Sequence, residues 1–165
     1  TTFLKYLNVE PDVELKITLA DVDCDHLDFA EYRLNSIKDK IDKNNQVQLN
    51  FERIQPDNLP IFDNSPVDIL FCFEVLEHVP SPVAVIKNII NSMMPGAIYI
   101  ENFIKHDHDD EEEDGPDLLS ARNERTEYYE LVSNYFNLIS PDQKTSEDNP
   151  NCTRIWQRNS LEFES

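Results

Sequence analysis

Residues 67–79 read VDILFCFEVLEHV, the longest dense apolar stretch of the chain. Its first seven residues form an apolar run of strand length that one aspartate interrupts. Runs of this kind are typical of central parallel strands that are covered on both faces. We therefore predict such a strand over 67–73, followed by a segment that carries Glu74, Glu77 and His78.

Strand and helix patterns alternate on both sides of this stretch. The patterns predict strands over 14–20, 47–51, 97–103, 136–139 and 153–157. They predict helices over 1–7, from Asp25 to Ile41, from Pro82 to Met93 with Ser81 as the N-cap, and over 127–136. This order indicates an α/β, Rossmann-like, doubly wound and mostly parallel sheet with a C-terminal antiparallel hairpin.

Ligands of such sheets bind at the carboxyl ends of the strands. The positions to inspect for a site are therefore the predicted strand ends, namely Asp21, Gln55, 72–74 and 101–103.

The composition favours one globular domain and limits its partners. We predict an α/β domain over 1–159, with a solvated acidic insertion over 105–117 and a tail over 160–165. The net charge of −19 disfavours nucleic acid and favours a neutral or cationic small molecule. No apolar run has the length of a membrane span, and three Cys without C-x-x-C spacing favour a reduced, cytoplasmic protein. The sequence leaves the oligomeric state open.

Four motifs, in the right order and spacing, resemble class I S-adenosylmethionine-dependent methyltransferases. The stretch VDILFCFEVLEHVPSP is similar to the fourth-strand motif of that family, and MPG to the turn before its fifth strand. ITLADVD resembles the second strand with its terminal acid, and NLP the loop after the third strand. The resemblance covers about residues 1–139. It implies S-adenosylmethionine as cofactor and, from the EVLEHV group, methyl transfer to a small molecule.

The resemblance also implies which residues bind the cofactor. Asp21 matches the acid that accepts hydrogen bonds from the ribose hydroxyls, although a turn or helix-cap role is an alternative. Gln55 stands where the family has an acid near the adenine amino group. The predicted cofactor-binding residues are Asp21, Val22, Ile54, Gln55, Cys72 and Phe73.

Glu74 and His78 are the candidate catalytic residues, spaced i, i+4 just beyond the predicted fourth-strand motif. Histidine is a common general base in enzymes, so His78 would suit this role. In the alternative interpretation, His78 and Glu77 are packed structural residues of the motif. A further alternative follows from similarity to small-RNA 3′-end methyltransferases, in which Glu74, Glu77 and His78 hold a divalent ion together with His106 or His108. We predict no metal site.

Two features depart from the family pattern. The chain has only two glycines, and no first strand or G-x-G-x-G loop precedes the residues TTFL, which resemble those just after that loop. We therefore expect a strand and a glycine-rich loop upstream of Thr1 in the natural protein. If they are absent, the alternative is a degenerate, non-catalytic binding domain of the same fold. The fourth-strand motif argues against a third alternative, a nicotinamide-dependent oxidoreductase.

Overall fold

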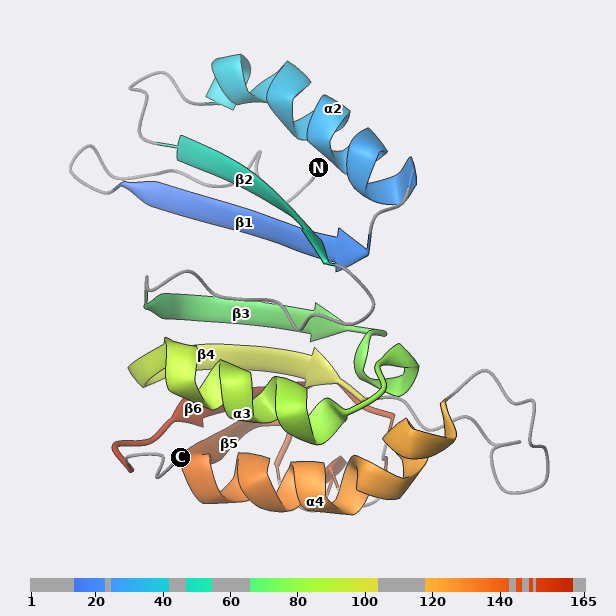
Figure 1. Ribbon diagram of the computed structural model, residues 1–165. Helices are drawn as coiled ribbons and strands as arrows, with labels where there is room; N and C mark the ends of the chain where they lie inside the picture. The colour runs from blue at the N-terminus through green and yellow to red at the C-terminus, as the bar shows by residue number, and fades with distance from the viewer. Residues whose placement is uncertain are drawn as a thin grey trace. The chain divides into compact units, whose positions relative to one another are not determined.

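The computed structural model describes residues 14–22, 25–41, 47–54, 66–103, 118–142, 145–146, 149 and 151–161. The chain divides into two compact units, Thr1–Pro60 and Ile61–Ser165, each with its own sheet (Figure 1). The predicted helix over 1–7 and the predicted acidic insertion over 105–117 lie outside the described residues. None of the described helices is long and apolar enough to cross a membrane.

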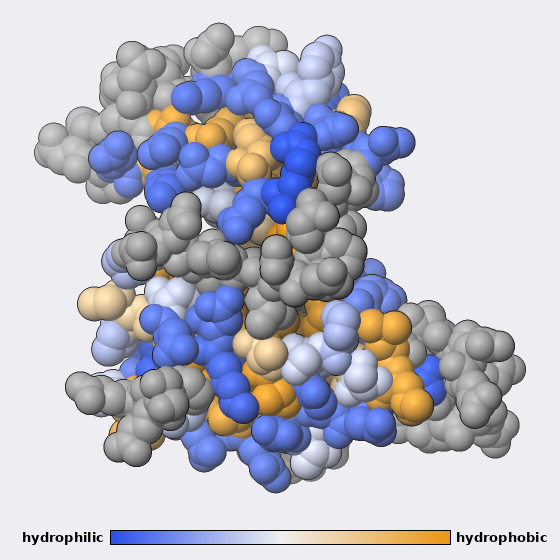
Figure 2. Space-filling view, in the orientation of Figure 1, coloured by the Kyte–Doolittle hydropathy of each residue, from blue (hydrophilic) through white to orange (hydrophobic). Residues whose placement is uncertain are grey.

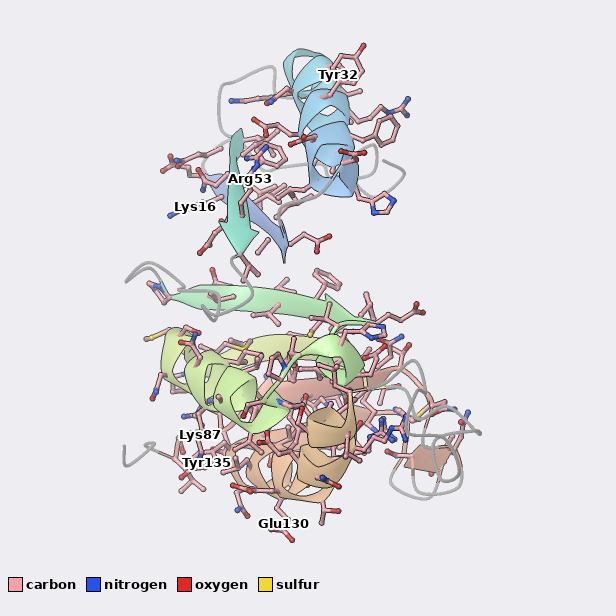
Figure 3. The ribbon with its side chains drawn as sticks, turned by 45° about the vertical axis from the view of Figure 1, so that its right-hand side comes forward. Lys16, Tyr32, Arg53, Lys87, Glu130 and Tyr135 are labelled. Carbon is pink, nitrogen blue, oxygen red and sulfur yellow. The ribbon has the colours of Figure 1, made fainter. Side chains whose placement is uncertain are left out.

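The first unit contains two parallel strands and one helix. Strand β1 (Leu15–Val22) pairs with β2 (Val47–Ile54), and α2 (Asp25–Ile41) connects them. As predicted, α2 begins at Asp25, and an acid in this first turn is favoured by the helix dipole. Arg53 of β2 donates to two acids of α2, Asp28 at 2.6 Å and Glu31 at 3.1 Å (Figure 3). These contacts fasten α2 to β2 and raise the pKa of Arg53.

The second unit contains a four-stranded mixed sheet in the order β3-β4-β6-β5. Strands β3 (Val67–Phe73) and β4 (Met93–Asn102) are parallel, and β6 (Arg154–Arg158) lies antiparallel between β4 and β5 (Phe136–Ser140). The predicted C-terminal antiparallel hairpin is thereby confirmed.

Two helices, α3 (Pro82–Ser92) and α4 (Leu119–Tyr135), pack on each other and on one face of this sheet (Figure 1). As predicted, Ser81 is the N-cap of α3: its Oγ accepts from the Ala84 N–H at 3.2 Å. Glu124 of α4 then accepts from the Ser81 hydroxyl at 2.8 Å and joins the two helices. The buried core of this unit consists of Cys72, Leu76, Val83, Val85, Ile86, Ile89, Ile90, Met93, Ala97, Tyr99, Phe103, Ala121, Tyr128, Val132, Phe136 and Trp156.

Three sequence predictions about this unit are wrong in detail. Helix α3 ends at Ser92, because Met93 already belongs to β4, and α4 begins at Leu119 rather than at 127. The side chains of Ile69 and Phe71 on β3 are 56% and 54% exposed, although we predicted a strand covered on both faces. The reason is that α3 and α4 pack on one face of this sheet, whereas Ile69 and Phe71 point to the other face.

On the face shown in Figure 2, much of the coloured surface of each unit is hydrophilic. Apolar areas interrupt it in the view of Figure 2. The large hydrophobic side chains that are exposed among the described residues are Phe29, Tyr32, Ile69, Phe71, Phe73, Val75, Met94, Leu118, Leu119, Ile139 and Leu161.

Gly96 is the one described residue of β4 whose backbone favours glycine, with a φ of +91°. A Cβ atom at this position would meet no other atom within 4 Å, so only the backbone conformation opposes a side chain. We expect Gly96→Ala to lower the free energy of unfolding by about 1–2 kcal/mol, because L residues are strained at positive φ. Urea denaturation measures this, and an unchanged unfolding midpoint would contradict it.

Candidate functional site

The first unit brings three of the predicted cofactor-binding residues to one edge of its sheet. Asp21 and Val22 end β1, Ile54 ends β2, and the parallel register pairs Val22 with Ile54. The side chain of Asp21 is exposed. A carboxylate at such a strand end can accept two hydrogen bonds from neighbouring hydroxyls. Gln55, the next residue after β2, lies outside the described residues.

In the second unit, Cys72 and Phe73 end β3 and point to opposite faces of the sheet. The Cys72 thiol is buried in the core beside Tyr99, and burial raises its pKa to about 12. It is therefore a neutral core group, so a contact from Cys72 to a ligand would use its backbone. Phe73 is 45% exposed, which leaves its ring accessible at the carboxyl end of the strand.

The turn after β3 starts at Glu74, an exposed residue with a φ of +53°. Its backbone N–H donates to the side-chain oxygen of Asn102, the last residue of β4, at 2.8 Å. Phe73 and Asn102 are register partners, so the two strands end side by side. Sequence analysis identified the strand end over 101–103 as a place to inspect but assigned Asn102 no role.

His78 and Glu77 lie in the short 3-10 helix η1 (Leu76–His78) and differ strongly in burial. The side chain of His78 is 53% exposed, whereas that of Glu77 is 1% exposed. His78 Nε2 lies 4.0 Å from Glu77 Oε1. Glu77 is therefore packed in the interior, as the structural interpretation predicts. His78 is open to solvent, so its side chain is accessible to a substrate as a proton acceptor.

The described residues contain no group of three His, Cys, Asp or Glu side chains that could hold a metal ion. Two members of the metal alternative, His106 and His108, lie outside the described part of the chain. Support for an ion held by Glu74, Glu77 and His78 is therefore lacking.

A buried carboxylate, Glu101, fixes the end of β4 from the core side. Its Oε1 accepts from Trp156 Nε1 at 3.1 Å, and its Oε2 accepts from the Phe103 backbone N–H at 2.7 Å. The Tyr129 hydroxyl lies 3.4 Å from Oε2, and Arg154 Nη1 lies 3.9 Å from Oε1. Burial raises the pKa of Glu101, and these donors only partly offset it. Sequence analysis missed this network, because its members are far apart in the chain.

Comparison with known proteins identifies the family. A family model described as a methyltransferase domain matches residues 14–100, more than half of the chain. The chain belongs to this methyltransferase domain family. The match runs from the start of β1 into β4, and so includes the strand ends at Asp21 and Phe73.

Among curated proteins, the ubiquinone biosynthesis O-methyltransferase of Neisseria meningitidis serogroup C is 27% identical over 81 residues. This alignment covers 48% of the present chain and 34% of that enzyme, so the chain spans about a third of this relative.

Two solved structures share the fold at low sequence identity. A SAM-dependent methyltransferase from Methanosarcina mazei has a TM-score of 0.51 and 16% identity, over 89% of this chain and 83% of its own. The O-methyltransferase TomG from Streptomyces achromogenes, solved with SAM, has a TM-score of 0.52 and 14% identity, over 92% of this chain and 65% of its own. The family match confirms the predicted methyltransferase domain, and the structural likeness confirms its Rossmann-like fold.

Proposed function

We propose that the protein transfers a methyl group from S-adenosylmethionine to a small-molecule acceptor. The observation that carries this proposal is the family match over residues 14–100. It spans all of the residues that the sequence assigned to cofactor binding and to catalysis, from Asp21 to His78.

The proposed cofactor contacts follow the strand ends. Asp21 would accept hydrogen bonds from the two ribose hydroxyls, and Gln55 would accept from the adenine amino group. We propose Val22 and Ile54, which are register partners at the ends of β1 and β2, as further contacts in the first unit. In the second unit the proposed contact is Phe73, whose side chain is 45% exposed. The exposed carboxylate of Asp21 at the carboxyl end of β1 supports the first of these contacts.

We propose a single methyltransferase domain over residues 1–159, with 105–117 as an insertion and 160–165 as a tail. The continuous family match across residues 14–100 supports this, because it includes parts of both compact units. A reduced, cytoplasmic environment is part of the same proposal, and it rests on the spacing of the cysteines.

Two observations support a small-molecule acceptor. The net charge of −19 repels a phosphate backbone, so a nucleic-acid substrate is disfavoured. The curated relative is an O-methyltransferase of ubiquinone biosynthesis by name, which makes a hydroxyl oxygen the first acceptor atom to test.

The cofactor would supply an electrophilic methyl group on a positive sulfur. Residues of this chain would place the acceptor in line with that group, which can contribute much of the rate. A hydroxyl acceptor must also lose its proton. The exposed side chains of His78 and Glu74 are the candidates to receive it.

The test is an assay of the full-length protein with S-adenosylmethionine and a panel of hydroxylated aromatic compounds, with an RNA as comparison. We expect formation of S-adenosylhomocysteine that depends on a small-molecule acceptor. Turnover with RNA alone would overturn the acceptor class. Cofactor binding without turnover on any acceptor would favour the non-catalytic alternative.

A further inference from the structure

The Glu74 turn after β3 is held in place by a side chain from the neighbouring strand. Glu74 has a φ of +53°, which lies in the left-handed region that residues other than glycine rarely adopt. The acceptor for its N–H is Asn102 Oδ1, at 2.8 Å. This hydrogen bond joins residues 28 positions apart, so it forms only when β3 and β4 are paired.

The backbone around Asn102 is itself fixed from the other face of the sheet. Glu101, which precedes it, is fully buried, and its carboxylate accepts from the N–H of Phe103, which follows it. Trp156 of β6 donates to the same carboxylate. Asn102 therefore offers its oxygen from a rigid strand end, so it can impose a conformation on the turn that it contacts.

The Glu74 turn lies at the carboxyl end of a parallel strand, where open α/β sheets bind their ligands. Non-glycine residues in strained backbone conformations cluster at such sites and persist where the surroundings hold them. Phe73 and Val75, on either side of Glu74, are each 45% exposed. The turn thus presents accessible groups whose positions depend on the contact with Asn102.

We propose that Asn102 is a positioning residue for the methyl donor, acting through the backbone of Glu74. Its side-chain oxygen keeps Glu74 in the left-handed conformation, and this sets the orientation of the turn toward the cofactor. The inference rests on the proposed function, because it concerns the same cofactor.

Substitutions at residue 102 separate the acceptor oxygen from the rest of the side chain. Asn102→Ala removes the acceptor, and we expect it to weaken the affinity for S-adenosylmethionine about five- to tenfold. This corresponds to the free energy of one hydrogen bond, which here also holds the conformation of the turn. Asn102→Asp keeps an oxygen at the same place and should stay within about threefold of wild type. Isothermal titration measures both dissociation constants, and thermal unfolding shows whether each variant is folded.

A second pair of variants tests whether the effect passes through Glu74. Glycine adopts positive φ readily, so a turn that starts with glycine depends less on the hydrogen bond to Asn102. In the Glu74→Gly background we expect Asn102→Ala to change the dissociation constant only about twofold. The experiment measures binding alone, because Glu74 is also a candidate catalytic residue.

The control is Asn137→Ala, which removes an exposed asparagine from β5 of the same sheet and should leave the affinity unchanged. If Asn102→Ala fails to fold, Asn102→Thr takes its place, since threonine suits a strand and its hydroxyl is shorter.

Three outcomes would overturn the inference. If wild type binds the cofactor and Asn102→Ala, or Asn102→Thr in its place, binds it equally well, the inference fails and the proposed function stands. If the Asp variant loses as much affinity as the Ala variant, the acceptor oxygen is not what matters. If wild type does not bind S-adenosylmethionine, the proposed function fails and the inference fails with it.

Discussion

Asp21→Ala is expected to weaken the affinity of the full-length protein for S-adenosylmethionine about a hundredfold. Two hydrogen bonds from hydroxyls to an exposed carboxylate would be lost, each worth a net of about 1–1.5 kcal/mol, and a hundredfold corresponds to about 2.7 kcal/mol. Asp21 is exposed at the end of β1, so its removal should affect binding far more than stability. Isothermal titration measures the affinity, and urea denaturation measures the stability.

The matched control for Asp21 is Glu14, an exposed acid that precedes β1 at its amino end. Glu14→Ala removes the same charge from the opposite end of the strand and should leave the dissociation constant within about twofold of wild type. Asp21→Asn keeps one acceptor oxygen, and we expect an intermediate loss of about tenfold. An Asp21→Ala variant that binds S-adenosylmethionine as tightly as wild type would refute the ribose contact.

Glu101→Ala is expected to lower the free energy of unfolding by about 3–5 kcal/mol, the largest stability effect that we predict. The substitution leaves the Trp156 N–H and the Phe103 N–H buried without their acceptor, and Arg154 without its buried counter-charge. Urea denaturation measures the change. Glu130→Ala on the outer face of α4 is the control and should change stability by less than about 0.5 kcal/mol (Figure 3).

The same carboxylate gives a pH dependence of known sign. Burial raises the pKa of Glu101 above the ordinary value of 4.5, so the folded protein binds this proton more tightly than the unfolded chain does. Its contribution to stability is therefore fully present below pH 4.5 and is lost as the pH rises through the folded pKa.

Glu101→Gln cannot titrate, so it isolates this effect from the repulsion among the other acids. We expect the stability of wild type relative to Glu101→Gln to fall as the pH is raised from about 4.5. If the stability of wild type relative to Glu101→Gln instead rises with pH, the hydrogen bonds from Trp156 and Phe103 outweigh the effect of burial on the pKa of Glu101.

Residue patterns within single segments predicted several strands and helices correctly. The apolar run over 67–73, the Ser81 cap and the C-terminal hairpin each follow from neighbouring residues, and each is present. The start of α4 was missed because its first turns carry few apolar residues and only Ala121 is buried there. The exposure of Ile69 was missed because a sequence run does not show which face of a strand other elements cover.

The residues of the candidate site also divide into those that the sequence predicted and those that only the folded sheet brings together. The strand patterns placed Asp21 and Phe73 at predicted strand ends, and the family resemblance added Val22 and Ile54. All four residues lie at strand ends in the structure. The contact between Asn102 and Glu74 joins two strands, and its register appears only in the folded sheet.

The proposed function makes this protein an S-adenosylmethionine-dependent methyltransferase. Titration of the full-length protein with S-adenosylmethionine tests it most directly. We predict saturable binding of one cofactor per chain, with a dissociation constant between about 1 μM and 1 mM, the usual range for enzyme ligands. Absence of binding by a folded full-length protein at about 1 mM cofactor would contradict the claim.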